Sequence, residues 1–152
     1  MKSDSILFVI ITLLLTAPVF AAATPDGILG IWSTEGGDSR LELFKCGTAV
    51  CGKIVWLKEP RYIDSIDGPL GVTKIDRKNP ARSLRNRPIL GLSVMQGLSA
   101  KGDRRWENGT CYNPETGKSY KCKMYLKSKN LLEVRGFIGF SLFGRTLVLK
   151  RF

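Results

Sequence analysis

The sequence of 152 residues contains no histidine. Histidine is the side chain that most often serves as a general base near neutral pH, and it completes Ser-His-Asp and Cys-His catalytic sites and many metal sites. Its absence excludes all of these arrangements. The sequence also lacks a Gly-x-Ser-x-Gly nucleophile motif, a complete phosphate-binding loop and any convincing amphipathic helix. We therefore assign no catalytic residue and no cofactor.

Cysteine is scarce, and its spacing is unfavourable for zinc. The four cysteines form C-x4-C and C-x10-C pairs rather than the C-x2-C pairs of zinc knuckles, so we assign no metal. An even number of cysteines in an exported chain is typical of disulfides, and four cysteines allow three pairings. Each of the pairs Cys46/Cys51 and Cys111/Cys122 flanks a predicted hairpin turn. We predict these two bridges.

The first residues have the features of a signal peptide. Lys2 precedes an apolar stretch over residues 6–15, which is followed by Pro18 and small residues. We expect a signal peptide over 1–23, with cleavage at Ala21, Ala22 or Ala23, and a single domain over 24–152 in the periplasm or outside the cell. An uncleaved anchor is the alternative, because residues 5–24 carry no charge.

Acidic residues are outnumbered, 13 against 24 Lys and Arg, for a formal net charge of +11. Such a charge can attract lipid phosphates or acidic polysaccharides of the cell envelope, whereas export argues against nucleic acid as a partner. A soluble exported protein with a high pI and no polyanionic partner is the alternative. The cations concentrate in two places: Lys74, Arg77, Lys78, Arg82, Arg85 and Arg87 in one segment, and Lys118, Lys121, Lys123, Lys127 and Lys129 in another.

Apolar and polar residues alternate with a period of two in short runs between turn signals, which indicates half-buried antiparallel strands. About eight such runs follow one another, which predicts an all-β chain folded as an eight-stranded antiparallel up-and-down barrel. A two-sheet sandwich is the alternative. The expected strands lie around 30–33, 41–46, 52–56, 89–95, 105–112, 120–126, 132–138 and 145–151.

The pattern also predicts which side chains face inward. If Cys46 faces Cys51, Leu43 faces Ile54 and Leu41 faces Trp56. Cys111 would likewise oppose Cys122, and the change of parity at Trp106 predicts a bulge near residues 108–109. The inward rows contain no ionisable group: Leu41, Leu43, Ile54, Leu90, Leu92, Val94, Met124, Leu126, Leu132 and Val134.

The alternation lapses over residues 58–87, which we interpret as a flap at one barrel mouth with a short helical turn after Asn79-Pro80. The flap carries Asp64, Asp67 and Asp76, a set that could supply the paired carboxylates of a glycosidase. Solvated loop acids that balance nearby arginines are the favoured interpretation.

An ordered set of short motifs resembles the exported bacterial domain-of-unknown-function family 2147 over essentially the whole mature chain. The resemblance implies a lipocalin- or calycin-like barrel in which Trp32 packs at the closed end beneath a cation, Arg145 or Arg151. It implies no catalytic residues. The motifs are Gly30-Ile31-Trp32, residues 51–57, Asp76-x-x-Asn79-Pro80, residues 87–92, Trp106-x-x-Gly109, Tyr112-Asn113-Pro114-x-x-Gly117-Lys118-x-Tyr120, Leu132-x-Val134-Arg135-Gly136 and Gly144-Arg145-Thr146.

These observations favour a non-enzymatic barrel that binds a small apolar or amphipathic ligand. Arg82, Arg85 and Arg87 would pair with an anionic head group at the rim. The residues expected to line the ligand are Ile54, Trp56, Leu90, Leu92, Met124 and Val134. Two alternatives remain open: a cationic envelope-interaction module with a filled barrel, and a carboxylate-dependent hydrolase. The sequence leaves the ligand and the oligomeric state undetermined.

Overall fold

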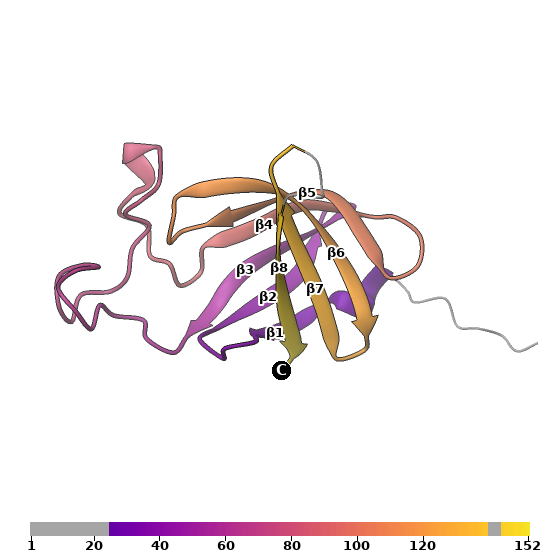
Figure 1. Cartoon of the computed structure of the whole chain (residues 1–152), viewed down its shortest axis with the longest axis horizontal. Coiled ribbons are helices and arrows are strands. Elements are labelled where there is room, and N and C mark those ends of the chain that lie inside the picture. Colours follow the sequence, from indigo (N-terminus) through magenta and orange to yellow (C-terminus); the bar gives the residue numbers. More distant parts are fainter. Residues whose placement is uncertain (1–24, 140–143) are drawn as a thin grey trace, which may run out of the picture.

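The computed structural model describes residues 25–139 and 144–152, so the predicted signal segment 1–23 lies outside the described residues. Eight antiparallel strands follow one another around a closed barrel, as predicted (Figure 1). The ring of strands and its core are complete within these residues. The strands are β1 (Gly30–Thr34), β2 (Ser39–Cys46), β3 (Ala49–Leu57), β4 (Ser93–Ala100), β5 (Arg105–Asn113), β6 (Lys118–Ser128), β7 (Leu131–Phe137) and β8 (Gly144–Arg151).

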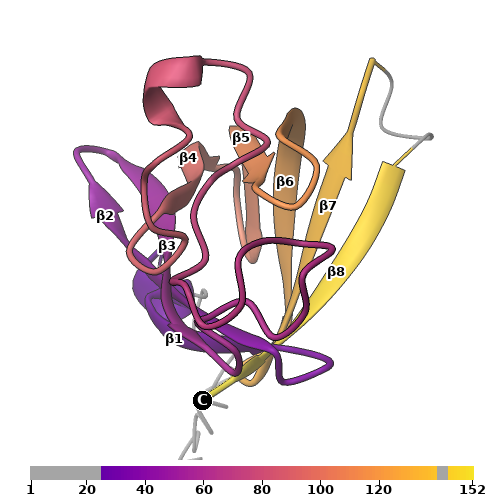
Figure 2. The ribbon, with the colours of Figure 1, turned by 90° about the vertical axis from the view of Figure 1, so that its left-hand side faces the viewer.

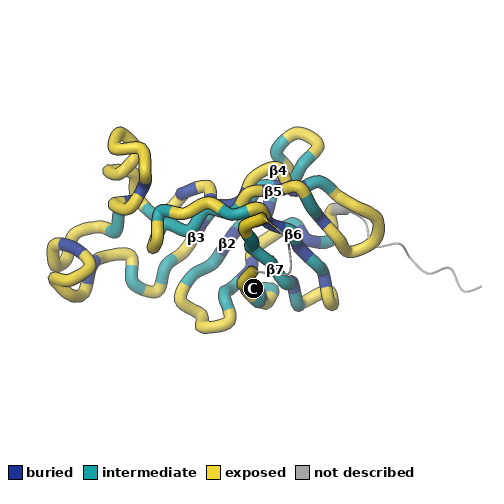
Figure 3. The backbone as a smooth tube through the Cα atoms, turned by 45° about the horizontal axis from the view of Figure 1, so that its top comes forward, coloured by how far each residue is buried: buried dark blue, intermediate teal, exposed yellow. Residues whose placement is uncertain are grey.

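The core lies inside the ring because apolar side chains occupy alternate strand positions. In β6, Met124 is fully buried and pairs with Val134 of β7, while Leu126 pairs with Leu132. This is the row predicted from the alternation. Figure 3 shows the same alternation as buried and exposed stretches along the strands. The side chains with less than 2% exposure include Trp32, Leu43, Leu98, Trp106, Met124, Leu132 and Leu149.

The β2–β3 hairpin has a different register from the one predicted. Cys46 pairs with Ala49, not Cys51, because Gly47 adopts a positive φ of 68° and allows a two-residue turn. The bridge to Cys51 therefore runs diagonally across the pair, with a Cα–Cα distance of 5.8 Å. The disulfide is the predicted one, although the facing residues are shifted.

The β5–β6 hairpin shows the same kind of shift. Cys111 pairs with Tyr120 and Cys122 pairs with Gly109, so the second disulfide is also diagonal, with a Cα–Cα distance of 5.7 Å. The predicted bulge is confirmed, since the register changes between Trp106 and Gly109. This change of parity lets Trp106 face the core.

One end of the barrel is closed by the 3-10 turn η1 (Pro25–Ile28), which precedes β1. The Trp32 indole nitrogen donates to the carbonyl of Ile28 at 2.8 Å, and the Arg151 guanidinium lies 4.2 Å from the indole centroid. Arg151 is thus the cation that the family resemblance implied, and Arg145 is not. Its guanidinium also donates to the carbonyls of Leu29 and Gly27, which fixes η1 beneath the barrel.

At the opposite, open end, residues 58–92 leave the ring as two lobes that project beyond the strands (Figures 1 and 2). The predicted flap, residues 58–87, thus extends to residue 92, and we call the whole segment 58–92 the flap. One lobe is a loop over residues 61–73, and the other carries η2 (Arg82–Leu84), the predicted helical turn. The strand predicted from residue 89 begins only at Ser93, because residues 89–92 form turns. No helix in the described part of the chain is long and apolar enough to cross a membrane.

Candidate functional site

The candidate site is the open half of the barrel, where β8 is no longer paired with β1. β8 pairs with β1 only from Leu149 to Arg151 in the described residues, although it pairs with β7 from Gly144 to Lys150. Leu147 faces Val134, and Arg145 faces Gly136, so both belong to the inner face. Leu147 is nevertheless 41% exposed. Solvent therefore reaches the inner face of β8 near the mouth.

Four of the six residues predicted to line a ligand belong to the buried core: Ile54, Leu92, Met124 and Val134. Leu90 does not, because it lies in the turn before β4 and is 47% exposed. Among the four, Met124 has no exposed surface and belongs to the filled part of the barrel. In the open half, Val134 pairs with the exposed Leu147 of β8, and Leu92 is a buried residue just before β4, where the flap rejoins the barrel.

Trp56 was expected beside Leu41 on the inner face, and a bulge changes its position. Leu41 pairs with Ile54, and the next pair along β2 is Arg40 with Trp56, so β3 has an extra residue there. The Arg40 guanidinium lies 4.5 Å from the Trp56 ring and 3.5 Å from the ring of Phe152, and Trp56 is 36% exposed. Trp56 therefore contacts Arg40 at the surface, whereas a residue of the inward row would pack in the barrel core.

A buried polar cluster joins the flap to β5. Asp76 is fully buried, and its carboxylate accepts hydrogen bonds from the Tyr112 hydroxyl at 2.5 Å, from Asn79 at 2.8 Å and from Arg87 at 2.9 Å. Burial, followed by the hydrogen bond to Asp76 and its negative charge, raises the pKa of Tyr112 from 10.0 to about 12. We call Asp76, Asn79, Arg87 and Tyr112 the flap anchor.

The flap anchor was not predicted as a unit. Its members appeared separately in three of the family motifs: Asp76-x-x-Asn79, the motif over residues 87–92, which begins with Arg87, and the motif beginning with Tyr112. The sequence did contain one signal for this cluster, which is Asp76 inside a cationic segment. A carboxylate that becomes buried needs a hydrogen-bonding or charged partner. The tip of the β5–β6 hairpin strengthens the attachment: a Cβ on Gly117 would overlap the backbone carbonyl of Lys78.

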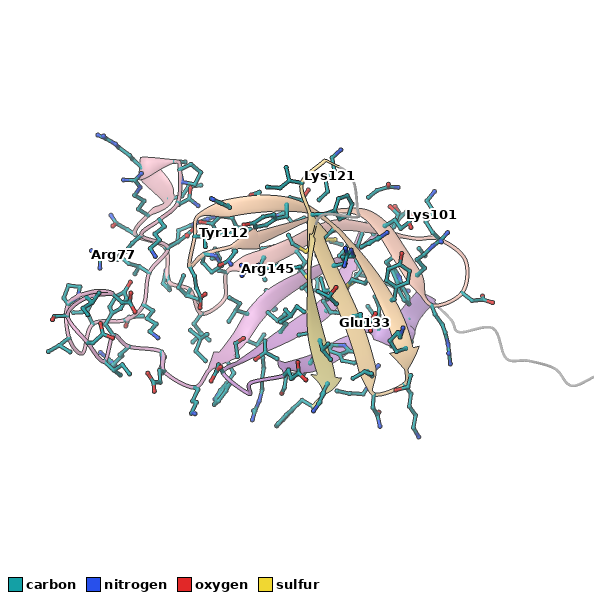
Figure 4. All side chains as sticks on the ribbon, in the orientation of Figure 1. Arg77, Lys101, Tyr112, Lys121, Glu133 and Arg145 are labelled. Carbon is teal, nitrogen blue, oxygen red and sulfur yellow. A yellow bond between two sulfur atoms is a disulfide. The ribbon has the colours of Figure 1, made fainter. Side chains whose placement is uncertain are left out.

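The three predicted rim arginines have different surroundings. Arg87 pairs with Asp76, and Arg85 donates to the Asn79 carbonyl at 2.7 Å, so both hold the flap in shape. Arg82 lies exposed in η2. Arg145 is a cation on the inner face near the mouth, and the predicted inward rows did not include it. Figure 4 shows Tyr112 and Arg145 in the half of the molecule nearer Arg77, with Lys101 at the opposite end.

Two of the three aspartates considered as a carboxylate pair, Asp64 and Asp76, have separate partners. The Asp64 carboxylate accepts the backbone N–H groups of Ile66 and Asp67 within its own loop, whereas that of Asp76 belongs to the flap anchor. These contacts are those of turn formation and flap attachment. In the described part of the chain, no group of three or more acidic or cysteine side chains could hold a metal ion.

Two hollows lie at the closed end. A shallow groove of about 630 Å³ is lined by residues 101–105 and by Tyr125, Leu126 and Lys127. Its cations are partly paired, because Arg105 contacts Glu107 at 3.3 Å and Lys127 contacts Glu133 at 3.6 Å. A smaller hollow of about 170 Å³ lies beside the β2–β3 turn and touches Trp106. Neither hollow is lined by the flap anchor or by the inner face of β8.

Comparison with known proteins gives a family and a structural relative. Residues 30–151 match the sequence family described as "Uncharacterized protein conserved in bacteria (DUF2147)". The chain is similar to the solved structure titled "Protein HP1028 from the human pathogen Helicobacter pylori belongs to the lipocalin family", with a TM-score of 0.68 and 25% identity over 82% of each chain. No curated protein matches the chain.

The family match begins at the first residue of β1 and ends at the last residue of β8, so it covers the entire ring of strands. The structural similarity agrees with the lipocalin-like order of strands and with the Trp32–Arg151 contact at the closed end. The chain therefore belongs to the DUF2147 family and has a lipocalin-like barrel.

Proposed function

We propose that the protein binds a small apolar or amphipathic ligand in the open half of its barrel and has no enzymatic role. The observation that carries the proposal is the exposure of Leu147 on an inner face where its neighbours Val134, Leu132 and Leu149 are buried and apolar. An apolar wall that solvent can reach gains free energy when an apolar ligand covers it, by about 25 cal/mol for each Å².

The interior of the closed half leaves little room for a ligand beyond the hollow of about 170 Å³ beside Trp106. Trp32, Trp106 and Leu98 are each at most 1% exposed there, and close packing of this kind is typical of a protein interior. The ligand would therefore occupy the space between Leu147, Leu92, Ile54 and the flap. A single short chain or ring suits this half better than a long chain that spans the barrel.

Arg145 supports an anionic head group. Arg145 lies two residues nearer the mouth than Leu147 and on the same, inward face of β8. It has no carboxylate partner among the described residues. A carboxylate or phosphate there would form a charge-assisted hydrogen bond with the guanidinium. Arg82 on the flap is a second candidate for the same contact.

Two disulfides support export, because such bridges persist in oxidising compartments. The apolar stretch over residues 6–15 supports the same conclusion. We place the protein in the periplasm or outside the cell. The lipocalin relative supports binding rather than catalysis.

The test is displacement of a fluorescent fatty-acid probe from the wild-type chain and from two variants of β8. Arg145→Gln should weaken binding of the fatty acid by about tenfold, the range of one charge-assisted hydrogen bond, and leave binding of the matching fatty alcohol almost unchanged. Lys150→Gln is the matched control, because Lys150 lies on the outer face of the same strand.

Two results would contradict the proposal. The first is a wild-type chain that binds neither the acid nor the alcohol at any concentration below probe micelle formation. The second is equal weakening by Arg145→Gln and Lys150→Gln. A loss on Arg82→Ser with no change on Arg145→Gln would keep the ligand site and move its head group to the flap.

A further inference from the structure

The lobe over residues 61–73 exposes large apolar side chains at the outermost part of the molecule. Ile66 is 92% exposed, Ile63 67% and Leu70 64%. Single exposed apolar residues are ordinary on a protein surface, whereas a group of them in one short loop marks an interaction site. Figure 3 shows this lobe as exposed along most of its length, and the exceptions are the buried Tyr62 and Gly68.

The loop that carries these exposed side chains has a defined structure. The buried ring of Tyr62 packs against Gly68, where a Cβ would overlap the ring. The Asp64 carboxylate accepts the N–H groups of Ile66 and Asp67 at 2.9 and 3.0 Å, and Arg61 donates to the carbonyl of Gly71. The loop is therefore folded around Tyr62, and its apolar side chains point outward from it.

The neighbouring lobe is strongly cationic. Asp76 is the one acid among residues 74–87, and it is buried and paired with Arg87. Lys78 and Arg82 are exposed and have no carboxylate partner among the described residues. Arg77 joins the two lobes, because its guanidinium donates to the carbonyl of Asp67. An apolar tip thus lies beside a positive surface on the same flap.

We propose that the flap is a docking surface for an anionic lipid bilayer. The side chains of Ile63, Ile66 and Leu70 enter the boundary between head groups and acyl chains, and Lys78 and Arg82 face lipid phosphates. Charge alone would serve a polysaccharide equally well. The exposed isoleucines favour a lipid surface over a polysaccharide, because of these two polyanions the bilayer is the one that offers them an apolar environment.

The inference rests on the flap surface and not on ligand binding inside the barrel. Docking would bring the open end of the barrel toward the bilayer, since the flap projects from that end (Figures 1 and 2). A lipophilic ligand could then pass between membrane and barrel with little exposure to water. A chain that docks without binding a ligand, or binds without docking, separates this inference from the proposed function.

The experiment measures co-sedimentation of the chain 24–152 with vesicles of phosphatidylcholine alone or with one quarter phosphatidylglycerol. This chain includes the complete ring and core and omits the apolar stretch 6–15, which would itself bind lipid. We expect binding to the anionic vesicles and little binding to the neutral ones. Lys78→Gln combined with Arg82→Gln should weaken it about 25-fold, from roughly fivefold for each cation.

Ile63→Ser combined with Ile66→Ser should weaken binding by at least tenfold at unchanged charge. The matched charge control is Lys101→Gln with Lys129→Gln, which removes two cations from loops at the closed end and should leave binding within twofold. All these positions are exposed, so the variants should keep the wild-type melting temperature. Equal losses in the control and in Lys78→Gln/Arg82→Gln would overturn the docking surface.

An independent measurement uses Ile66→Trp and vesicles with brominated acyl chains. The new indole should shift its emission to shorter wavelength and be quenched by the anionic vesicles, whereas Lys129→Trp should show neither change. Binding that responds to the cations but shows no quenching at residue 66 and no effect of the serine variants would identify a polyanion site and refute membrane docking.

Discussion

Replacement of Trp32 by alanine should be among the most damaging single changes at the closed end. The indole is fully buried, its nitrogen donates to the Ile28 carbonyl at 2.8 Å, and the Arg151 guanidinium lies 4.2 Å from its centroid. Truncation of a buried tryptophan costs about 3–5 kcal/mol from lost transfer energy and the remaining cavity. The orphaned carbonyl and the lost cation–π contact place the expected change in unfolding free energy near the top of this range.

Trp56→Ala is the matched control, because it removes the same side chain and also a cation–π contact. Trp56 is 36% exposed and its contact with Arg40 lies at the surface, so we expect a cost of about 1–2 kcal/mol. Urea unfolding followed by far-ultraviolet circular dichroism measures both changes from the transition midpoint and slope. Equal costs at positions 32 and 56 would refute the role of Trp32 as the buried plug of the closed end.

A second comparison isolates the hydrogen bond. The Trp106 indole nitrogen is buried and has no hydrogen-bond partner among the described residues, whereas that of Trp32 has one. Trp32→Phe removes a satisfied donor, and Trp106→Phe removes an unsatisfied one at a similar loss of volume. Trp32→Phe should therefore be the more destabilising by about 1–2 kcal/mol. The opposite order would show that packing outweighs the bond to Ile28.

Three further predictions concern the open end and the hairpins. Tyr112 has a pKa of about 12 in the folded chain and an ordinary value of 10.0, so its contribution to stability should be complete below pH 10 and lost between pH 10 and 12. Urea unfolding measured across this interval should show a shallower decline of the unfolding free energy in Tyr112→Phe than in the wild type. Gly117→Ala should lower the unfolding free energy by more than Gly47→Ala. Both glycines have φ near +70°, but only a Cβ at 117 overlaps backbone atoms, those of Lys78. Equal costs would show that the contact between the hairpin and the flap does not contribute to stability. Replacement of Cys46 and Cys51 by alanine should cost about 2 kcal/mol in thermal or urea unfolding, the loop-closure value for so short a ring, and non-reducing peptide maps should show this bridge intact in the wild type.

The alternation of side chains was enough to predict the barrel, because the period of two is a property of single strands. It also located the bulge near Asn108, where the parity of Trp106 could not otherwise be reconciled with that of Cys111. Closure and strand order followed from the number of sequential strands and short turns. These are local properties, so a single sequence contains them.

Register was harder to predict, because it depends on the number of residues in each turn. Placing Cys46 opposite Cys51 assumed that bonded cysteines face one another, and the diagonal geometry with a Cα–Cα distance of 5.8 Å satisfies a disulfide equally well. The position of Trp56 was wrong for a related reason. One extra residue in β3 breaks the alternation, and no residue around Val55 is of a type that predicts a bulge.

The flap anchor could not be predicted, because it joins Asp76 to Tyr112 across 36 positions and three of its four members lie in a segment without periodicity. Its geometry nevertheless explains why the cationic flap has a fixed shape. A buried carboxylate with three donors is stable only while all three remain in place, so the flap and the β5–β6 hairpin form one unit. Loss of the Tyr112 hydroxyl should therefore loosen the flap from β5, because the other two donors, Asn79 and Arg87, lie in the flap itself. For the proposed functions this rigidity matters, because it keeps the apolar tip at Ile66 and the mouth beside Arg145 in a fixed relation, and a flexible flap would spend part of its binding free energy on ordering them.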